Sequence, residues 1–274
     1  MLDIPANKRL IVALDYDDQE EALALVEKLG DLVGFYKVGW QLFMKSHFNI
    51  IENLAEMEKR IFIDLKMGDI PATIYKALKN MPAKSAHFIE LMTLSGLGAT
   101  VTAAREGASS QELKFLMLTV LSSMDEGDIK ELYGDQADLK KIILFIAGKA
   151  IDAGCNGLIA SGDSVRQIRE KFGDDPIIVT PGIRPAGADV NDHKRAQTPQ
   201  RAIANGADYL VVGRPITQAD DAVAAAKSII AGIQEGLDAR AALKKHKPTG
   251  NQNSIQAPGG QFSAVAGLGD YAEQ

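Results

Sequence analysis

The sequence predicts a single-domain (β/α)₈ barrel, also called a TIM barrel, and three observations favour this fold class. Short apolar runs alternate with amphipathic stretches, a pattern typical of a parallel sheet covered by helices. Eight such runs fit within residues 1–231, a length that suits a closed eight-unit barrel. The first run leads into DYDDQEE rather than a glycine-rich turn, so a nicotinamide cofactor is not expected. An open doubly wound sheet stays an alternative, because periodicity does not report closure.

Each expected strand is a short run dominated by apolar residues. In chain order the strands are LIVALDY (10–16), GFYKVGW (34–40), RIFIDLKM (60–67), HFIELMT (87–93), KFLMLTVLS (114–122), GLIAS (157–161), IIVTPG (177–182) and YLVVGR (209–214). Amphipathic helices are expected between them, for example at 19–29, 73–80, 139–153 and 218–230.

The composition changes after residue 231. We expect residues 1–231 to form the barrel and residues 232–274 to form a flexible or surface-draped extension. The last part of this extension is rich in Gly, Asn, Gln and Ser and has few large apolar residues to anchor it. One more helical stretch at GIQEGLDARAALKKHK is compatible with the sequence.

Composition and charge exclude several classes of partner. The chain has 274 residues, 46% of them hydrophobic, and a formal charge of −6. With a pI near 5.3 it offers no basic field for nucleic acid. Cys155 is the only cysteine, so no intrachain disulfide can form. No basic–apolar signal segment opens the chain, and no apolar run approaches the roughly 18 residues that span a membrane. We expect a soluble, cytoplasmic protein with a small-molecule ligand.

Charged residues gather where the first three strands end. Alternation places Asp64 and Lys66 on one face of their strand, while Asp15 ends the first strand and Lys37 lies in the second. Consecutive strands are neighbours in a barrel, so these four side chains are expected to meet as acid, base, acid, base. Asp69 follows in the next loop. An ion-pair network that only orients the strands is the alternative to a catalytic site.

The sequence does not predict a metal centre. The four histidines show no metal-ligand spacing, and they are His47, His87, His193 and His246. A magnesium ion on Asp64 and Asp69 is conceivable, but the neighbouring lysines would compete with it.

A phosphate site is expected where the last two strands end. The loops after strands seven and eight form the usual phosphate cradle of this barrel. Gly182 and Gly213 would let backbone N–H groups approach the ligand, Arg214 would bind the phosphate, and Arg184 would support it. The long polar segment 183–197 is either a lid over the phosphate or an ordered surface loop.

Six motifs together resemble one enzyme family. In this order and spacing, they resemble the orotidine 5′-phosphate decarboxylases over roughly residues 8–231: ALD (13–15), YKVGW (36–40), DLKMGDIPAT (64–73), LTVLSSM (118–124), TPGIRP (180–185) and DYLVVGRPIT (208–217). The DxKxxDI element combined with two phosphate loops is highly specific.

The resemblance implies a homodimeric barrel that converts orotidine 5′-monophosphate (OMP) to UMP and carbon dioxide in de novo pyrimidine biosynthesis, without metal or organic cofactor. By position, Lys37, Asp64 and Lys66 would form an alternating charge network. Asp69 would reach into the partner's site beside Thr73. Lys66 would stabilise and then protonate the carbanion left at a ring carbon.

The resemblance also implies substrate-binding roles. Asp15 and Lys37 would hold the ribose hydroxyls, Ser122 the pyrimidine and Arg214 the phosphate. Two departures from many bacterial members are present. His193 stands where a glutamine touches the ligand, and Met92 stands where a histidine ends strand four. We expect the first to alter affinity rather than abolish activity.

Three other functions remain open from the sequence. One is a magnesium-dependent sugar-phosphate decarboxylase or hexulose-phosphate synthase of the same superfamily, which also carries an Asp-x-Lys strand. Another is a non-catalytic phosphoribosyl-binding barrel, against which the complete acid–base set argues. The third is a Schiff-base aldolase that uses Lys66 or Lys37, although flanking carboxylates favour the charged amine.

Overall fold

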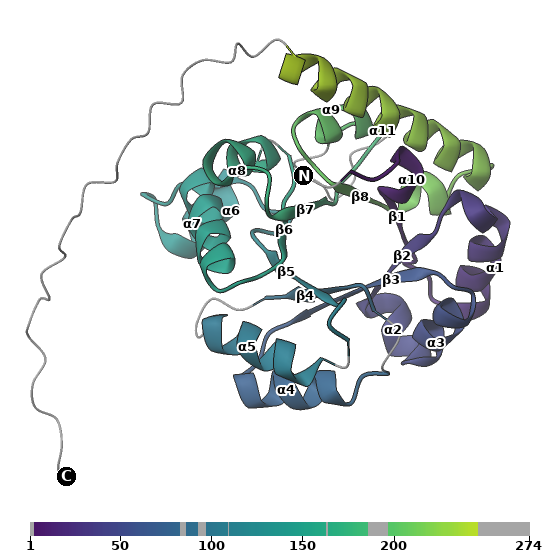
Figure 1. Cartoon of the computed structure of the whole chain (residues 1–274), viewed down its shortest axis with the longest axis horizontal. Coiled ribbons are helices and arrows are strands. Elements are labelled where there is room, and N and C mark those ends of the chain that lie inside the picture. Colours follow the sequence, from purple (N-terminus) through teal and green to yellow (C-terminus); the bar gives the residue numbers. More distant parts are fainter. Residues whose placement is uncertain are drawn as a thin grey trace, which may run out of the picture.

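The computed structural model is a closed barrel of eight parallel strands in sequential order, as predicted. The structure describes residues 3–82, 86–92, 97–108, 110–162, 164–185 and 197–245. The last strand pairs with the first through Leu10–Leu210 and Val12–Val212, so the open doubly wound alternative is wrong. Figure 1 shows the ring of strands with the helices arranged outside it.

All eight expected strands are present, although most end earlier than predicted. Their bounds are β1 (Leu10–Ala13), β2 (Phe35–Gly39), β3 (Arg60–Met67), β4 (Phe88–Leu91), β5 (Lys114–Leu118), β6 (Gly157–Ile159), β7 (Ile177–Thr180) and β8 (Tyr209–Val212). Asp15 and Ser122 therefore lie in loops after β1 and β5, rather than inside strands as the apolar runs suggested. Pairing ends where the chain turns toward the outer helices.

Helices follow the strands and cover the outside of the barrel. They are α1 (Gln19–Leu29), α2 (Trp40–Ser46), α3 (Asn49–Glu56), α4 (Pro71–Lys79), α5 (Leu97–Gly107), α6 (Glu126–Tyr133), α7 (Leu139–Asp152), α8 (Ser164–Phe172), α9 (Pro199–Ala204), α10 (Arg214–Thr217) and α11 (Ala222–Lys245), with short 3₁₀ turns at η1 (Ala6–Lys8) and η2 (Gly30–Leu32). Among these described helices, none combines the length and apolar character that crossing a bilayer requires.

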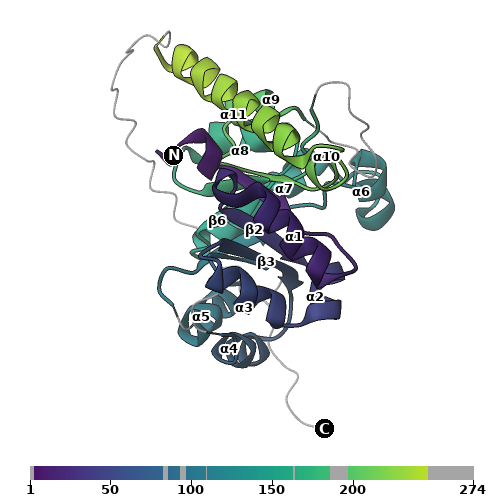
Figure 2. The same cartoon turned by 90° about the vertical axis from the view of Figure 1, so that its right-hand side faces the viewer.

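The last helix differs from the one expected at 218–230. It begins at Ala222 because the Asp221 side chain accepts hydrogen bonds from the N–H groups of Val223 and Ala224, which caps the first turn. It then continues to Lys245, so the boundary expected after residue 231 falls inside a single helix. Figures 1 and 2 show α11 lying along α9. Residues 246–274 lie outside the described part of the chain.

The strands are buried on both faces, which explains why they read as nearly continuous apolar runs. In β1, Leu10 and Val12 pack outward against the helices, whereas Ile11 and Ala13 pack inside the barrel. The interior cluster is small and lies below the charged residues at the strand ends. It consists of Ile11, Ala13, Phe35, Phe62, Phe88, Leu116, Ile159, Val179, Tyr209 and Val211.

Aromatic rings fill the end of the barrel where the strands begin. Phe35, Phe88 and Tyr209 pack with ring centroids 5.1–5.8 Å apart, and the Arg60 guanidinium lies 4.2 Å from the centroid of Phe35. Ile4 packs against the same interior cluster. Side chains therefore fill this end of the barrel, so an active site is expected at the other end. Figure 2 shows α6 and α10 at that other end, far from the N-terminus.

A buried acid at the start of β8 holds the filled end together. Asp208 is 1% exposed, and its Oδ2 accepts hydrogen bonds from Arg169 Nη2 at 2.6 Å and from the N–H of Ile178 at 3.0 Å. Arg9 Nη1 donates to the Asp208 carbonyl oxygen at 3.0 Å. The cluster ties β8 to α8, β7 and the segment before β1.

Replacing Asp208 by alanine is expected to destabilise the fold without affecting the chemistry. The change leaves buried guanidinium groups without their counter-charge, which costs about 3–5 kcal/mol and lowers Tm by roughly 10 °C. Thermal unfolding followed by circular dichroism measures the loss. Asp135→Ala, an exposed aspartate in the loop before α7, is the matched control. Equal melting temperatures for the two variants would show that the cluster contributes nothing.

Candidate active site

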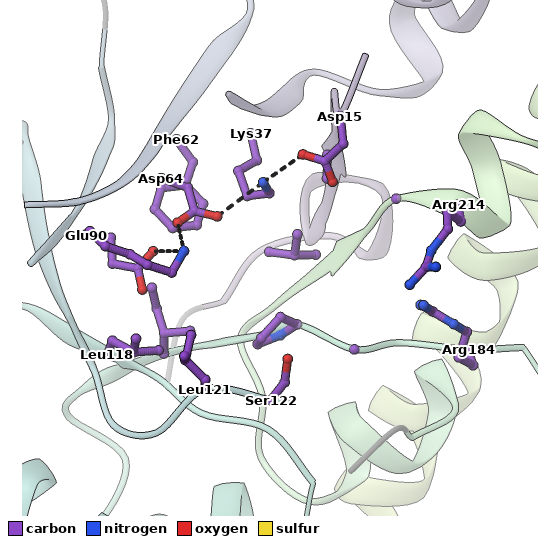
Figure 3. Close-up of a pocket in the computed structure, with 17 residues that line it drawn as sticks. Asp15, Lys37, Phe62, Asp64, Glu90, Leu118, Leu121, Ser122, Arg184 and Arg214 are labelled. Atoms are coloured by element: carbon purple, nitrogen blue, oxygen red, sulfur yellow. Dashed lines mark hydrogen bonds and ion pairs between the residues drawn. The ribbon is translucent and has the colours of Figure 1, made fainter. Parts of the chain in front are cut away.

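A cavity opens at the carboxyl ends of the strands and gathers side chains from all eight of them or the loops that follow. It is lined by Ala13, Asp15, Lys37, Phe62, Asp64, Lys66, Glu90, Leu118, Leu121, Ser122, Ile159, Pro181, Gly182, Arg184, Val211, Gly213 and Arg214. Charged groups lie on two sides of this cavity, and Figure 3 shows the acid–lysine row facing a pair of arginines across it.

The four charges expected to meet form one continuous row. Lys37 Nζ lies 3.2 Å from Asp15 Oδ1 and 3.1 Å from Asp64 Oδ2, so it joins the loop after β1 to β3. Lys66 Nζ donates to Asp64 Oδ1 at 2.6 Å. A fifth residue extends the row, because Glu90 Oε2 lies 3.4 Å from the same Lys66 nitrogen. Figure 3 shows these contacts as dashed lines.

An irregularity in β3 turns Lys66 into the cavity. Ile63 pairs with Ile89 and Met67 with Leu91, so three residues of β3 stand opposite Glu90 alone. Lys66 takes up the extra length with a left-handed φ of 46°, which costs about 1–3 kcal/mol for a residue with a Cβ. Strain of this kind persists where the surrounding structure demands a particular side-chain direction.

The chain after Lys66 passes very close to β4. A Cβ on Gly68 would lie 2.3 Å from the carbonyl oxygen of Met92, so only glycine fits there. The N–H of Met92 donates to the carbonyl of Met67 at 3.0 Å. The Met92 side chain is half-exposed and borders an apolar groove beside β5, not the charged cavity.

Burial and neighbouring charges act in opposite directions on the pKa values of Lys37 and Asp64. Burial would lower the pKa of Lys37, but Asp64 and Asp15 outweigh it and raise the pKa above 10.5. Burial would raise the pKa of Asp64, but a hydrogen bond with Glu90 and the charges of Lys37 and Lys66 lower it to about 2. Both groups are therefore ionised at neutral pH.

The pKa values of Lys66 and Glu90 are both raised, but for different reasons. Burial would lower the pKa of Lys66, but the carboxyls of Glu90 and Asp64 raise it, so the amine is an ammonium. Burial is also the main cause that raises the pKa of Glu90 well above 4.5, and the neighbouring Asp64 adds to it. Lys66 opposes this shift without cancelling it.

Sequence reasoning missed Glu90. The only signal was an isolated acid in the apolar strand FIEL, two residues after the inward-facing Phe88. Alternation would have placed Glu90 on the same face, inside the barrel next to β3.

The opposite side of the cavity is formed by the loops after β7 and β8. Gly182 has a φ of 76°, a left-handed conformation that glycine adopts without strain. The next residues pair with the far end of the loop, where the N–H of Arg184 donates to the Gln197 carbonyl at 2.9 Å. Figure 3 shows the guanidinium groups of Arg184 and Arg214 pointing toward each other at the cavity. Two adjacent cations suit a doubly charged anion.

The expected site residues divide into three groups. Nine of them line the cavity, and they are Asp15, Lys37, Asp64, Lys66, Ser122, Gly182, Arg184, Gly213 and Arg214. Asp69 and Thr73 are exposed and do not line it. His193 and most of the segment 183–197 lie outside the described residues.

No group of three or more His, Cys, Asp or Glu side chains within the described ranges is arranged to hold a metal ion. Asp64 has its two oxygens on two ammonium groups, one from Lys37 and one from Lys66. The donor set around Asp64 therefore does not fit a divalent cation, since both neighbours are positively charged.

Comparisons with known proteins give one consistent result. The family model described as orotidine 5′-phosphate decarboxylase / HUMPS family matches residues 8–229. An orotidine 5′-phosphate decarboxylase of Bradyrhizobium sp. (strain BTAi1) is 43% identical over 86% of this chain and 95% of the relative. The enzyme of that name from Methylococcus capsulatus is 42% identical over 85% and 94%. The crystal structure of the Lactobacillus acidophilus enzyme superposes with a TM-score of 0.71 at 34% identity, over 82% of this chain and 98% of that one.

Proposed function

The chain is an enzyme of the orotidine 5′-phosphate decarboxylase / HUMPS family, and from this membership we propose that it converts OMP to UMP and carbon dioxide in pyrimidine biosynthesis. The observation that carries the proposal is the continuous row of alternating charges that includes the Lys66 ammonium, with two arginines across the same cavity. The row suits a reaction in which negative charge develops on carbon, and the arginines suit a substrate phosphate.

Lys66 is the proposed acid of the reaction. Breaking the bond between the ring and the carboxylate releases carbon dioxide and leaves the electron pair on the ring carbon, where no carbonyl can delocalise it. The ammonium of Lys66 stabilises this charge and transfers a proton to the carbon, which gives UMP. Solvent then returns a proton to the amine. The raised pKa of Lys66 ensures that the amine enters the cycle protonated.

Asp64 and Lys37 are the proposed electrostatic partners of Lys66. Asp64 holds the ammonium at 2.6 Å and is itself held by Lys37 at 3.1 Å. A pair of unit charges at 4 Å and an effective dielectric of 20 interacts with about 4 kcal/mol, or roughly three powers of ten in rate. The rest of the acceleration has to come from binding energy at the phosphate and ribose, which keeps the site closed and ordered.

The remaining contacts of the substrate are proposed from the resemblance to the family, and the residues that line the cavity support them. In this proposal Asp15 and Lys37 bind the ribose hydroxyls, and Ser122 binds the pyrimidine. The phosphate is held opposite the lysines by Gly182, Arg184, Gly213 and Arg214, with His193 contributing from the loop after β7. All of these residues that the structure describes line the cavity, and His193 lies outside the described part of the chain.

A homodimer belongs to the same proposal. Asp69 and Thr73 are exposed on the loop after β3 and on α4, away from the cavity of their own chain. In a twofold dimer the same surface of each subunit contacts the other. We therefore propose that each subunit places its Asp69 and Thr73 at the site of its partner. We also propose that the dimer acts in the cytoplasm.

The other candidate functions find less support in the cavity. A magnesium-dependent sugar-phosphate decarboxylase or synthase needs oxygen ligands, but both oxygens of Asp64 contact ammonium groups. A Schiff-base aldolase needs a neutral amine, but the pKa values of Lys37 and Lys66 are raised. A non-catalytic binding barrel has no need of strained backbone at Lys66.

The purified chain is expected to decarboxylate OMP at the same rate with and without EDTA, because protein cations alone supply the positive charge in this mechanism. The loss of OMP absorbance and the appearance of UMP measure the turnover. Magnesium-dependent turnover of a sugar phosphate, with none of OMP, would instead establish the magnesium-dependent alternative. Binding of OMP or UMP without turnover in either buffer would point to the non-catalytic barrel.

A further inference from the structure

Glu90 is a buried carboxyl in the cavity that the proposed mechanism does not use. It lies on the inner face of β4 and is 2% exposed. Its Oε2 is 3.4 Å from Lys66 Nζ, while its Oε1 has no hydrogen-bond partner among the described residues. Burying a carboxylate oxygen without a donor is costly, so the group calls for an explanation of its own.

The row of charges contains more acids than bases. Within the row, Asp15, Asp64 and Glu90 form ion pairs only with Lys37 and Lys66, so full ionisation would leave the row with one excess negative charge, while the two arginines lie on the opposite side of the cavity. Asp15 is half-exposed and reaches solvent. Of the two buried acids, Asp64 contacts both ammonium groups, whereas Glu90 contacts one at the longer distance. Glu90 therefore gains the least from ionising and loses the most hydration.

Among the described residues around Glu90, Asp64 is the polar neighbour besides Lys66. Glu90 lies on β4, between β5 and β3. The apolar Leu116 and Leu118 of β5 lie on one side of it, and Asp64 and Lys66 of β3 lie on the other. Asp64 Oδ1 and Glu90 Oε2 lie 2.6 Å and 3.4 Å from the same Lys66 nitrogen, so the two carboxyls are neighbours. Two neighbouring ionised carboxylates repel each other, but one shared proton converts the contact into a charge-assisted hydrogen bond.

We propose that Glu90 is a positioning residue that acts as a neutral acid, donating a hydrogen bond to ionised Asp64 and orienting Lys66 without adding a second full negative charge beside it. This inference rests on the proposed decarboxylation for its kinetic consequences. The raised pKa of Glu90 and the lowered pKa of Asp64 agree with a proton that stays on Glu90. A second ionised carboxylate would bind the Lys66 proton more tightly and make the ammonium a weaker acid toward the substrate carbon.

Two substitutions separate a neutral acid from an ionised one. Glu90→Gln keeps the size and a hydrogen-bond donor but no charge, so it is expected to lower kcat by less than about threefold at pH 7. Glu90→Leu removes the donor and leaves Asp64 short of a partner, so kcat is expected to fall by about 10- to 100-fold with little change in KM. Glu52→Gln, on the exposed face of α3, is the matched control. Equal losses for Gln and Leu would overturn the proposal.

The pH dependence of stability gives a second readout. Since the folded-state pKa of Glu90 is raised, its contribution to stability is complete below the unfolded pKa near 4.5 and is lost as pH rises through the folded value. The stability of the wild type relative to Glu90→Gln is therefore expected to decline with rising pH above about 4.5. A difference that grows with rising pH would mean that Glu90 is stabilised as a carboxylate, and would refute the neutral acid.

Infrared spectroscopy tests the protonation state without any turnover. The wild type at pH 7 is expected to show the carbonyl band of a buried neutral carboxylic acid that is absent from Glu90→Gln. A missing band overturns the inference about Glu90 even if OMP is decarboxylated. A band in a protein that does not decarboxylate OMP would instead support Glu90 as a neutral acid and reject the proposed reaction, so the two failures are distinguishable.

Discussion

Replacing Lys66 by alanine is expected to lower kcat/KM for OMP by at least ~10⁴-fold while the barrel stays folded. The variant loses both the ammonium that faces the developing carbanion and the proton that the product requires. Proton transfer accounts for about 10²–10⁴ of such a loss, and electrostatic stabilisation for about 10²–10³. The fold is expected to survive because Lys37 still contacts Asp64 at 3.1 Å. Steady-state kinetics and circular dichroism measure the two outcomes.

The control for this variant is Lys130→Ala, which removes an exposed lysine of α6 outside the cavity. It should keep the activity of the wild type. An undiminished rate in Lys66→Ala would show that another group protonates the ring carbon, and the proposed mechanism would have to be abandoned.

A mixture of two inactive variants is expected to regain activity. Asp64→Ala removes a residue of the cavity, whereas Asp69→Ala removes a residue that lies outside the cavity of its own chain. If each site combines Asp64 of one subunit with Asp69 of the other, one of the two sites in a mixed dimer is intact. Random exchange of subunits then restores about a quarter of the wild-type activity. Each variant alone should be nearly inactive.

The matched control is a mixture of Asp64→Ala with Lys66→Ala. Both changes lie in the same cavity, so neither site of that mixed dimer is complete. Recovery in this control, or no recovery in the Asp64→Ala and Asp69→Ala mixture, would argue against a shared site. Sedimentation of the mixed sample establishes in the same experiment whether the chain forms dimers at all.

The fold class was predictable because it depends on local patterns that the sequence displays directly. All eight strands were found, since strands buried on both faces are short apolar runs bounded by turns. The exact ends of the strands were less predictable. Asp15 and Ser122 continue the apolar runs LIVALDY and KFLMLTVLS, and no sequence signal marks the point where pairing stops. The length of α11 was likewise underestimated, because the composition changes before the helix ends.

Part of the site followed from the same local reasoning. Alternation along β3 predicted that Asp64 and Lys66 share a face. Because consecutive strands are neighbours in a barrel, Asp15 and Lys37 were predicted to lie beside this pair, and they do. The two arginine-bearing loops could be placed at one cavity because β7 and β8 are neighbours, and their role in binding phosphate stays a prediction. These predictions needed only the order of the strands, which in this barrel is the same as their order along the chain.

The sequence by itself determined the barrel, the order of its strands and the charges that each strand carries to its carboxyl end. Only the tertiary structure decided that β3 bulges opposite β4, that Lys66 takes a left-handed conformation, and that Glu90 shares the Lys66 ammonium with Asp64. Register, strain and burial are properties of packed pairs of strands. Here they depend on how three residues of β3 fit opposite a single residue of β4, and no single stretch of sequence contains that information.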